Sequence, residues 1–75
     1  MENKKNNFKR ISENRVSKIL TLLSQLTNLS NSSFYEYTDD DVEKIFKAIN
    51  EEAKKSKEIL IKSNEKRRKN KRFEL

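Results

Sequence analysis

Apolar residues recur at three- and four-residue steps over two stretches of the chain, and this period predicts two amphipathic helices. We place the first helix at about 8–28, where the apolar positions cover roughly half of a helical wheel. The second helix is expected at about 38–62, with a narrower apolar stripe. Helices of similar length on either side of a short connection favour an antiparallel hairpin. The predicted fold class is therefore all-α.

The start of the second helix is the best-defined local feature of the sequence. Thr38 is a good N-cap, and Asp41 stands three residues later, in the spacing of a capping box. Tyr37 and Val42 occupy the two positions of a hydrophobic staple around that cap. Carboxylates crowd the first turns, where the positive end of the helix dipole favours them. A helix is therefore expected to begin at this point.

Three further segments complete the predicted organisation. Residues 1–7 are polar and are expected to form a flexible lead-in, with 8–61 as the helical hairpin and 62–75 as a basic tail. The connection, about 29–37, is rich in turn-forming residues. Because the chain has no glycine, we expect Asn28 or Asn31 to adopt the left-handed conformation where the first helix ends.

The composition narrows the possible functions of this 75-residue chain. Without cysteine or histidine, it lacks the usual nucleophile, the usual neutral-pH base and the usual ligands of zinc. Without glycine, it lacks a phosphate-cradling loop. We therefore expect no enzyme activity, no cofactor, no metal and no small-molecule substrate. No apolar run approaches the roughly 20 residues that span a bilayer, and the polar N-terminus indicates a cytoplasmic protein without a membrane partner.

Positive charge is concentrated at the C-terminal end of the sequence. Residues 62–75 contain seven Lys or Arg and two Glu, which is +5 of the formal +6 of the whole chain. Dense cations bind phosphates through counterion release, and this favours nucleic acid or a ribonucleoprotein. Acidic proteins, anionic membranes and a merely solubilising tail are the alternatives. The expected contact residues are Lys62, Lys66, Arg67, Arg68, Lys69, Lys71 and Arg72.

The apolar stripes indicate a second kind of contact. The stripe of the first helix is too wide for one neighbouring helix, so a second copy forming a four-helix bundle, or a larger protein, is expected to cover it. The connection contains three aromatic residues, Phe34, Tyr35 and Tyr37, which either close the end of the helix pair or bind a partner. Arg15 lies within the apolar sector, where it either extends to water or contacts a partner or phosphate. The expected partner-binding residues are Arg15, Leu22, Leu23, Leu26, Phe34, Tyr35, Ile45, Phe46 and Ile49.

Several short runs within about 8–60 support a resemblance. They are Phe8-Lys9-Arg10-Ile11, Arg15-Val16, Lys18-Ile19-Leu20, Asn28-Leu29-Ser30-Asn31, Tyr35-Glu36-Tyr37-Thr38 and Asp41-Val42-Glu43-Lys44-Ile45-Phe46-Lys47-Ala48-Ile49. With these runs the chain resembles a group of small helical proteins of plasmids, phages and other mobile elements of low-GC Gram-positive bacteria. That group has no assigned activity, so the resemblance implies a setting and no mechanism.

These observations favour a non-enzymatic binding protein of a mobile element that contacts nucleic acid or a ribonucleoprotein through its basic tail. The alternative is a phage- or plasmid-encoded protein–protein inhibitor or adaptor, for example an anti-CRISPR protein, that acts through its helical face and connection aromatics. A structural protein that only oligomerises is a further alternative.

Overall fold

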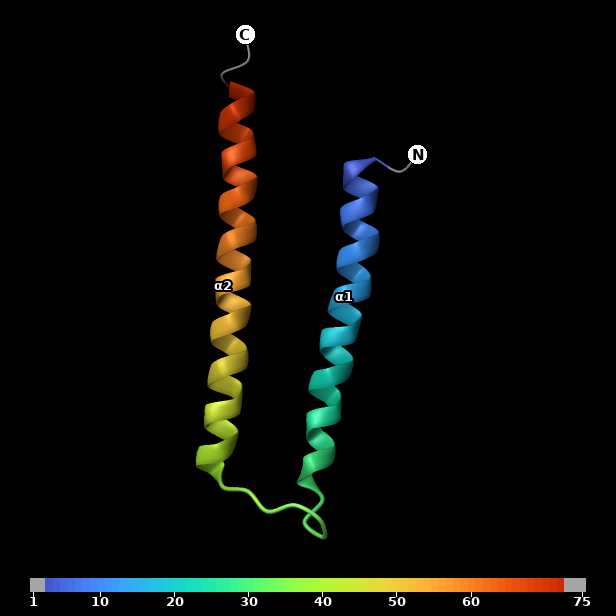
Figure 1. Cartoon of the computed structure of the whole chain (residues 1–75), viewed down its shortest axis with the longest axis vertical. Coiled ribbons are helices and arrows are strands. Elements are labelled where there is room, and N and C mark those ends of the chain that lie inside the picture. The colour runs from blue at the N-terminus through green and yellow to red at the C-terminus, as the bar shows by residue number, and fades with distance from the viewer. Residues whose placement is uncertain (1–2, 73–75) are drawn as a thin grey trace. The chain divides into compact units, whose positions relative to one another are not determined.

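The computed structural model describes the backbone of residues 3–72 and the side chains of residues 3–66. Over this part of the chain the structure contains two α-helices, α1 (Lys4–Leu26) and α2 (Asp39–Arg72), and no strand. A short 3₁₀ helix, η1 (Thr27–Ser30), follows α1 directly. The prediction of an all-α chain with two helices is confirmed (Figure 1).

The helix α1 begins earlier than the apolar period indicates. Asn3 is the N-cap in an extended conformation, and its side-chain oxygen accepts a hydrogen bond from the Asn6 amide over 2.8 Å. The Asn7 amide donates to the Asn3 carbonyl over 3.0 Å and closes the first turn. Residues 4–7 of the predicted lead-in therefore belong to α1, because a cap and good helix formers such as lysine begin a helix without an apolar residue.

The end of α1 differs from the expectation of a left-handed asparagine. No residue between 3 and 72 has a positive φ, and Asn31 is extended at φ −70° and ψ 101°. The chain instead tightens from α1 into η1, and the Thr27 hydroxyl donates to the Ser24 carbonyl over 2.6 Å. A 3₁₀ turn of this kind satisfies carbonyls at a helix end without a residue in the left-handed region.

The helix α2 starts as the sequence predicts. The Thr38 amide donates to Asp41 Oδ2 over 3.0 Å, and the Asp41 amide donates to Thr38 Oγ1 over 3.1 Å. The capping box is therefore present with both of its hydrogen bonds. The Val42 amide donates to the Thr38 carbonyl over 3.2 Å, which is the first helical hydrogen bond after the cap.

The helix α2 continues ten residues beyond the predicted end at Lys62, to Arg72. The apolar stripe is lost after Ile61, but lysine, arginine and glutamate are good helix formers, and no glycine or proline interrupts them. The backbone of 62–72 is thus part of α2 and is not a separate segment. The remainder of the predicted basic tail, residues 73–75, lies outside the described residues.

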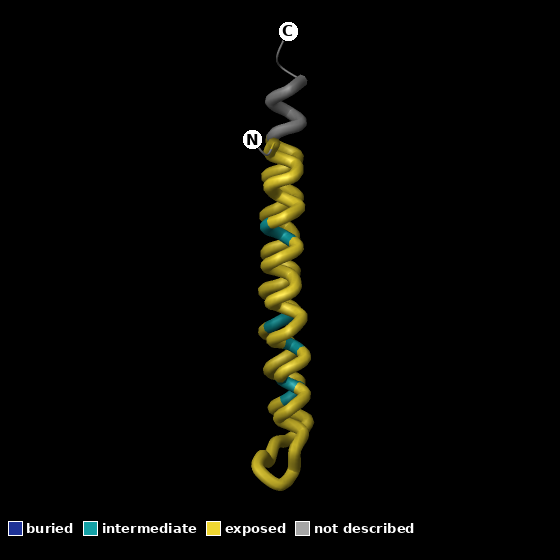
Figure 2. The backbone as a smooth tube through the Cα atoms, turned by 90° about the vertical axis from the view of Figure 1, so that its right-hand side faces the viewer, coloured by how far each residue is buried: buried dark blue, intermediate teal, exposed yellow. Residues whose placement is uncertain are grey.

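The chain divides into two compact units, Met1–Glu36 and Tyr37–Leu75, whose relative placement is not determined. No residue from 3 to 66 is buried, and Figure 2 shows only a few half-buried positions. The half-buried residues are Ile11, Ser12, Leu23, Leu26, Val42 and Ile49. Hairpin packing and dimerisation therefore stay predictions.

Candidate nucleic-acid interface

The first part of the predicted basic surface lies on the last turns of α2. Lys62 and Lys66 are both exposed and stand four residues apart, so they lie on the same side of the helix. The backbone of the remaining predicted contact residues also belongs to α2, whereas their side chains lie outside the described residues. These residues are Arg67, Arg68, Lys69, Lys71 and Arg72. A single helix thus carries all seven cations.

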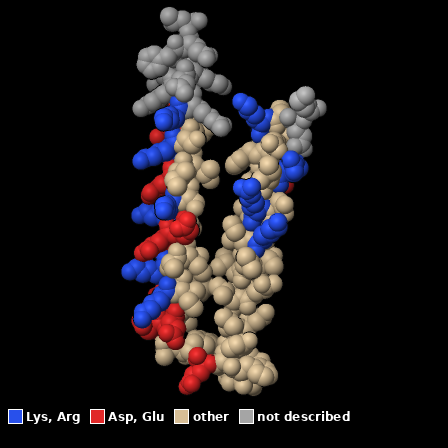
Figure 3. Space-filling model, viewed as in Figure 1, with Lys and Arg blue, Asp and Glu red and all other residues tan. Residues whose placement is uncertain are grey.

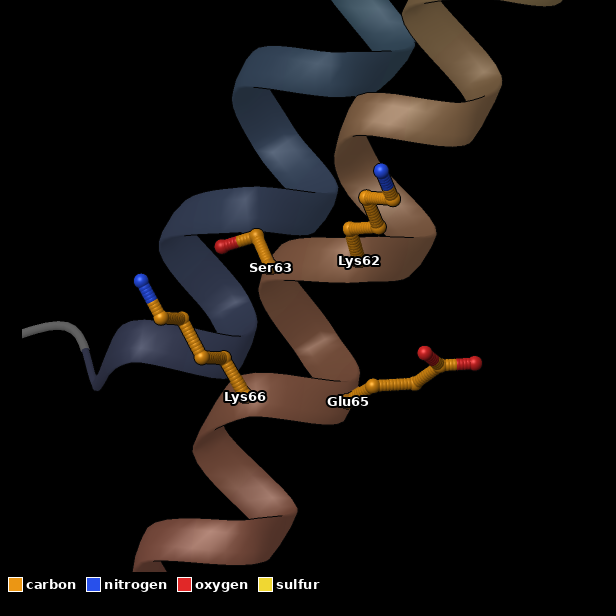
Figure 4. Close-up of a pocket in the computed structure, with 4 residues that line it drawn as sticks. All are labelled: Lys62, Ser63, Glu65 and Lys66. Atoms are coloured by element: carbon orange, nitrogen blue, oxygen red, sulfur yellow. The ribbon is translucent and has the colours of Figure 1, made fainter.

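A surface depression occurs within this basic segment and is lined by Lys62, Ser63, Glu65 and Lys66 (Figure 4). All four residues come from consecutive turns of α2, and Ser63 and Lys66 project to one side of the helix while Glu65 projects to the other. One helix offers no opposite wall that could enclose a small molecule. The depression thus combines two ammonium groups, one hydroxyl group and one carboxylate, and its lining has a net charge of +1.

The charge before Lys62 is of a different kind. Residues 39–61 contain seven Asp or Glu and five Lys, and the acids and bases alternate along the face seen in Figure 3. Lys44 Nζ and Asp40 Oδ2 form an ion pair of 3.1 Å at the solvent-exposed surface. Exposed pairs of this type contribute less than about 1 kcal/mol to stability. The excess of positive charge in α2 therefore begins at Lys62.

The predicted partner-binding residues of the two helices are apolar and incompletely covered. On α1, Leu22 is exposed, while Leu23 and Leu26 are half-buried. On α2, Ile45 and Phe46 are exposed and Ile49 is half-buried. Each set lies within its own helix at the predicted three- and four-residue spacing, so each helix presents an apolar face.

The two predicted aromatic residues of the connection are held by Asn31. The amides of Phe34 and Tyr35 both donate to the Asn31 carbonyl, over 3.1 and 3.0 Å, and the Ser33 amide donates to Asn31 Oδ1 over 3.0 Å. The rings of Phe34 and Tyr35 meet edge to face, with centroids 6.5 Å apart. Phe34 is nevertheless 79% exposed. The turn therefore holds an aromatic pair at the surface.

The structure reveals a second basic segment that the sequence analysis missed. The helix α1 contains six Lys or Arg and only one carboxylate, Glu13. The predicted start at Phe8 left Lys4 and Lys5 outside the helix. The +5 of residues 62–75 leaves only +1 for residues 1–61, because the acids of α2 offset the cations of α1. Asn3 was the sequence signal for this earlier helix start, because an asparagine can cap the amide three residues later, here that of Asn6. Arg15, the predicted contact residue on this helix, is exposed.

No group of three or more Asp, Glu, His or Cys side chains among residues 3–66 is placed to hold a metal ion. Within the same part of the chain, neither helix combines the length and the apolar character needed to cross a bilayer.

The fold and surfaces define an all-α chain with exposed apolar faces and two basic segments. No protein-family model, curated protein or solved structure matches this chain. Function is therefore inferred from the residues themselves.

Proposed function

We propose that this protein is a non-enzymatic binding protein that contacts nucleic acid, free or within a ribonucleoprotein, through the C-terminal end of α2. The observation that carries the proposal is the composition of 62–72, which places seven Lys or Arg and one Glu on a continuous helix. Lysine and arginine bound to backbone phosphates release counterions from the polyanion, and arginine also offers a fork that fits phosphate oxygens.

The proposed binding is largely independent of nucleotide sequence. The chain has no cysteine or histidine for a zinc finger, and its two long helices do not have the short helix-turn-helix arrangement that reads a major groove. Contacts to phosphates fix the position of a protein on nucleic acid without reading bases. The expected ligand is thus any duplex or single strand with a sufficient phosphate density. A mobile-element setting and a cytoplasmic location remain part of this proposal.

The proposal includes an antiparallel hairpin of α1 and α2 that pairs with a second copy in a four-helix bundle. The support for it is the exposed apolar face of each helix, which is costly to leave in water at about 25 cal/mol per Å² of apolar surface. Along α2 the spacing of Val42, Phe46, Ile49, Ala53 and Leu60 follows the alternating three- and four-residue steps of a helix–helix seam, apart from Ser56.

A charge-neutral variant of the α2 end tests the proposed function. We expect Arg67→Gln, Arg68→Gln, Lys69→Gln and Lys71→Gln together to weaken binding to a labelled duplex, because each lost phosphate contact removes about 0.9 from the slope of log affinity against log salt. Fluorescence anisotropy over a range of salt concentrations measures both the affinity and its dependence on salt. Glutamine preserves helix propensity, so the helix itself is expected to persist.

The matched control removes the same charge from the middle of α2. Lys47→Gln, Lys54→Gln, Lys55→Gln and Lys57→Gln take four cations from the mixed-charge part of the same helix. The control is expected to keep most of the salt dependence. Equal losses in the two variants would mean that net charge alone, and not the α2 end, governs binding.

A second candidate function is supported by the connection. Phe34 is 79% exposed and forms an edge-to-face pair with Tyr35, and exposed aromatic residues often dominate protein interfaces. This arrangement favours a protein–protein inhibitor or adaptor, for example an anti-CRISPR protein. Co-purification from the native host with and without nuclease separates the two functions. A nuclease-resistant protein partner that is lost on Phe34→Ala supports the inhibitor, whereas nuclease-sensitive material supports the nucleic-acid contact.

A further inference from the structure

The N-terminal half of α1 is strongly basic. Its cations all fall between residues 4 and 18, and no charged residue occurs from Ile19 to Tyr35. The one carboxylate of α1 is Glu13, so the helix has a net charge of +5. Figure 3 shows the same division, with blue side chains on one half of α1 and uncharged side chains on the other. The cations are Lys4, Lys5, Lys9, Arg10, Arg15 and Lys18.

Helix stability does not account for this charge. The first turn of α1 contains no acidic residue, and Lys4 and Lys5 occupy it instead. Cations at the positive end of a helix dipole are unfavourable by a few tenths of a kcal/mol each. In contrast, α2 begins with Asp39, Asp40 and Asp41, as the dipole favours. Lys4 and Lys5 therefore oppose a local rule that α2 follows, which is typical of a functional segment.

The spacing of the cations suits an extended polyanion. At 3.6 residues per turn, Lys4, Arg15 and Lys18 lie within about 60° of one another on the helix, over about 21 Å of its axis. A DNA duplex of that length carries about 12 phosphate charges. The side chains of all three residues are exposed. One side of α1 thus presents several cations to a ligand of matching length.

We propose that the basic half of α1 (residues 4–18) is a second phosphate-contacting surface, so that nucleic acid is held by both helices. This inference rests on the proposed function and adds a site to it. Both helices then share one plan, in which the excess of positive charge is concentrated away from the connection along the chain. Each basic segment sits at the end of its helix that is farthest along the chain from Asn31.

The distribution of charge favours nucleic acid over a membrane surface. A helix that lies in a lipid interface separates its cations and its apolar residues onto opposite faces. In α1 the cations are not confined to a polar face, because Lys5 and Lys9 share the angular sector of Phe8 and Val16. An anionic vesicle is therefore the competing ligand that the experiment must include.

The test compares two variants with equal loss of charge in the full-length protein. One carries Lys4→Gln, Lys5→Gln, Lys9→Gln and Lys18→Gln, and the other is the Lys47, Lys54, Lys55 and Lys57 control. For a labelled duplex, we expect the α1 variant to reduce the slope of log affinity against log salt by up to about 3.6, or about 0.9 for each contact. The control should change the slope far less. Replacing the same four α1 lysines by arginine should retain the wild-type slope, because the charge is kept.

Each alternative result has a clear meaning. Equal slopes for the α1 variant and the control would overturn this inference. The proposed function would still stand if the variant with Arg67, Arg68, Lys69 and Lys71 replaced by glutamine binds with a weaker salt dependence than the wild type. A wild-type protein that ignores the duplex would overturn both. If phosphatidylserine vesicles bind in an α1-dependent manner while the duplex does not, the ligand is a membrane and the inference fails. Circular dichroism of every variant confirms that helix content is retained, and the removal of first-turn cations should if anything raise it.

Discussion

Thr38 and Asp41 exchange two hydrogen bonds, of 3.0 and 3.1 Å, and so fix the residue at which α2 begins. This pairing was predictable because all of its partners lie within four residues, where sequence spacing determines geometry. The N-cap of α1 obeys the same chemistry, with Asn3 bonded to the Asn6 amide. It was missed because the helix start was sought at the first apolar residue, Phe8.

Replacement of Thr38 tests the cap at the scale of a single residue. We expect Thr38→Ala to lower the free energy of unfolding by about 1 kcal/mol, because the Asp41 amide loses its side-chain acceptor. Urea unfolding followed by circular dichroism measures the change. Thr38→Ser keeps the hydroxyl group and should remain close to wild type. Indistinguishable midpoints for the alanine variant and the wild type would show that the box does not stabilise α2.

At the scale of whole elements, the two helices were predictable in type but not in length. The apolar period identifies the parts of a helix that pack, and it ended at Ile61, whereas α2 continues to Arg72. The continuation of α2 to Arg72 depends on residues with high helix propensity and on the absence of glycine and proline, and both features can be seen in the sequence. The same reasoning applies to Lys4 and Lys5, which extend α1 without an apolar residue. The lengths of both helices therefore follow from helix propensity and capping residues, and not from the apolar period.

A proline within the basic segment tests the continuity of α2. Asn64→Pro removes a helical donor and clashes with the preceding turn, at a cost of about 3 kcal/mol. We expect the NMR secondary chemical shifts of residues 65–72 to lose their helical values in this variant, while Asn64→Ala retains them. Non-helical shifts for that segment in the wild-type protein would contradict a continuous α2.

At the scale of the whole molecule, the sequence predicts which faces need covering but not what covers them. Two amphipathic stripes are compatible with a hairpin, a bundle of two copies or a larger partner, because hydrophobic burial is not directional. The described residues include no buried side chain that would select among these arrangements. The basic segments are less ambiguous, since charge acts through solvent without a packed neighbour.

Light scattering at micromolar concentration tests the proposed bundle. We expect twice the mass of one chain for the wild type, because in the proposed bundle a second copy covers the exposed apolar face of α1. Leu22 is 63% exposed, and Leu22→Asp should shift the protein toward a monomer by placing a charge in the interface. Ser24→Asp adds the same charge on the polar side of α1 and should leave the dimer intact. A folded wild-type monomer would reject the bundle.

The most direct test of the central claim, that cationic helix ends bind nucleic acid, is the affinity of the full-length protein for a labelled duplex as salt is raised. The account predicts a linear fall of log affinity against log salt with a slope of about −3.6 or steeper, which corresponds to four or more phosphate contacts. Absence of binding at low salt, or an affinity that salt leaves unchanged, would contradict it.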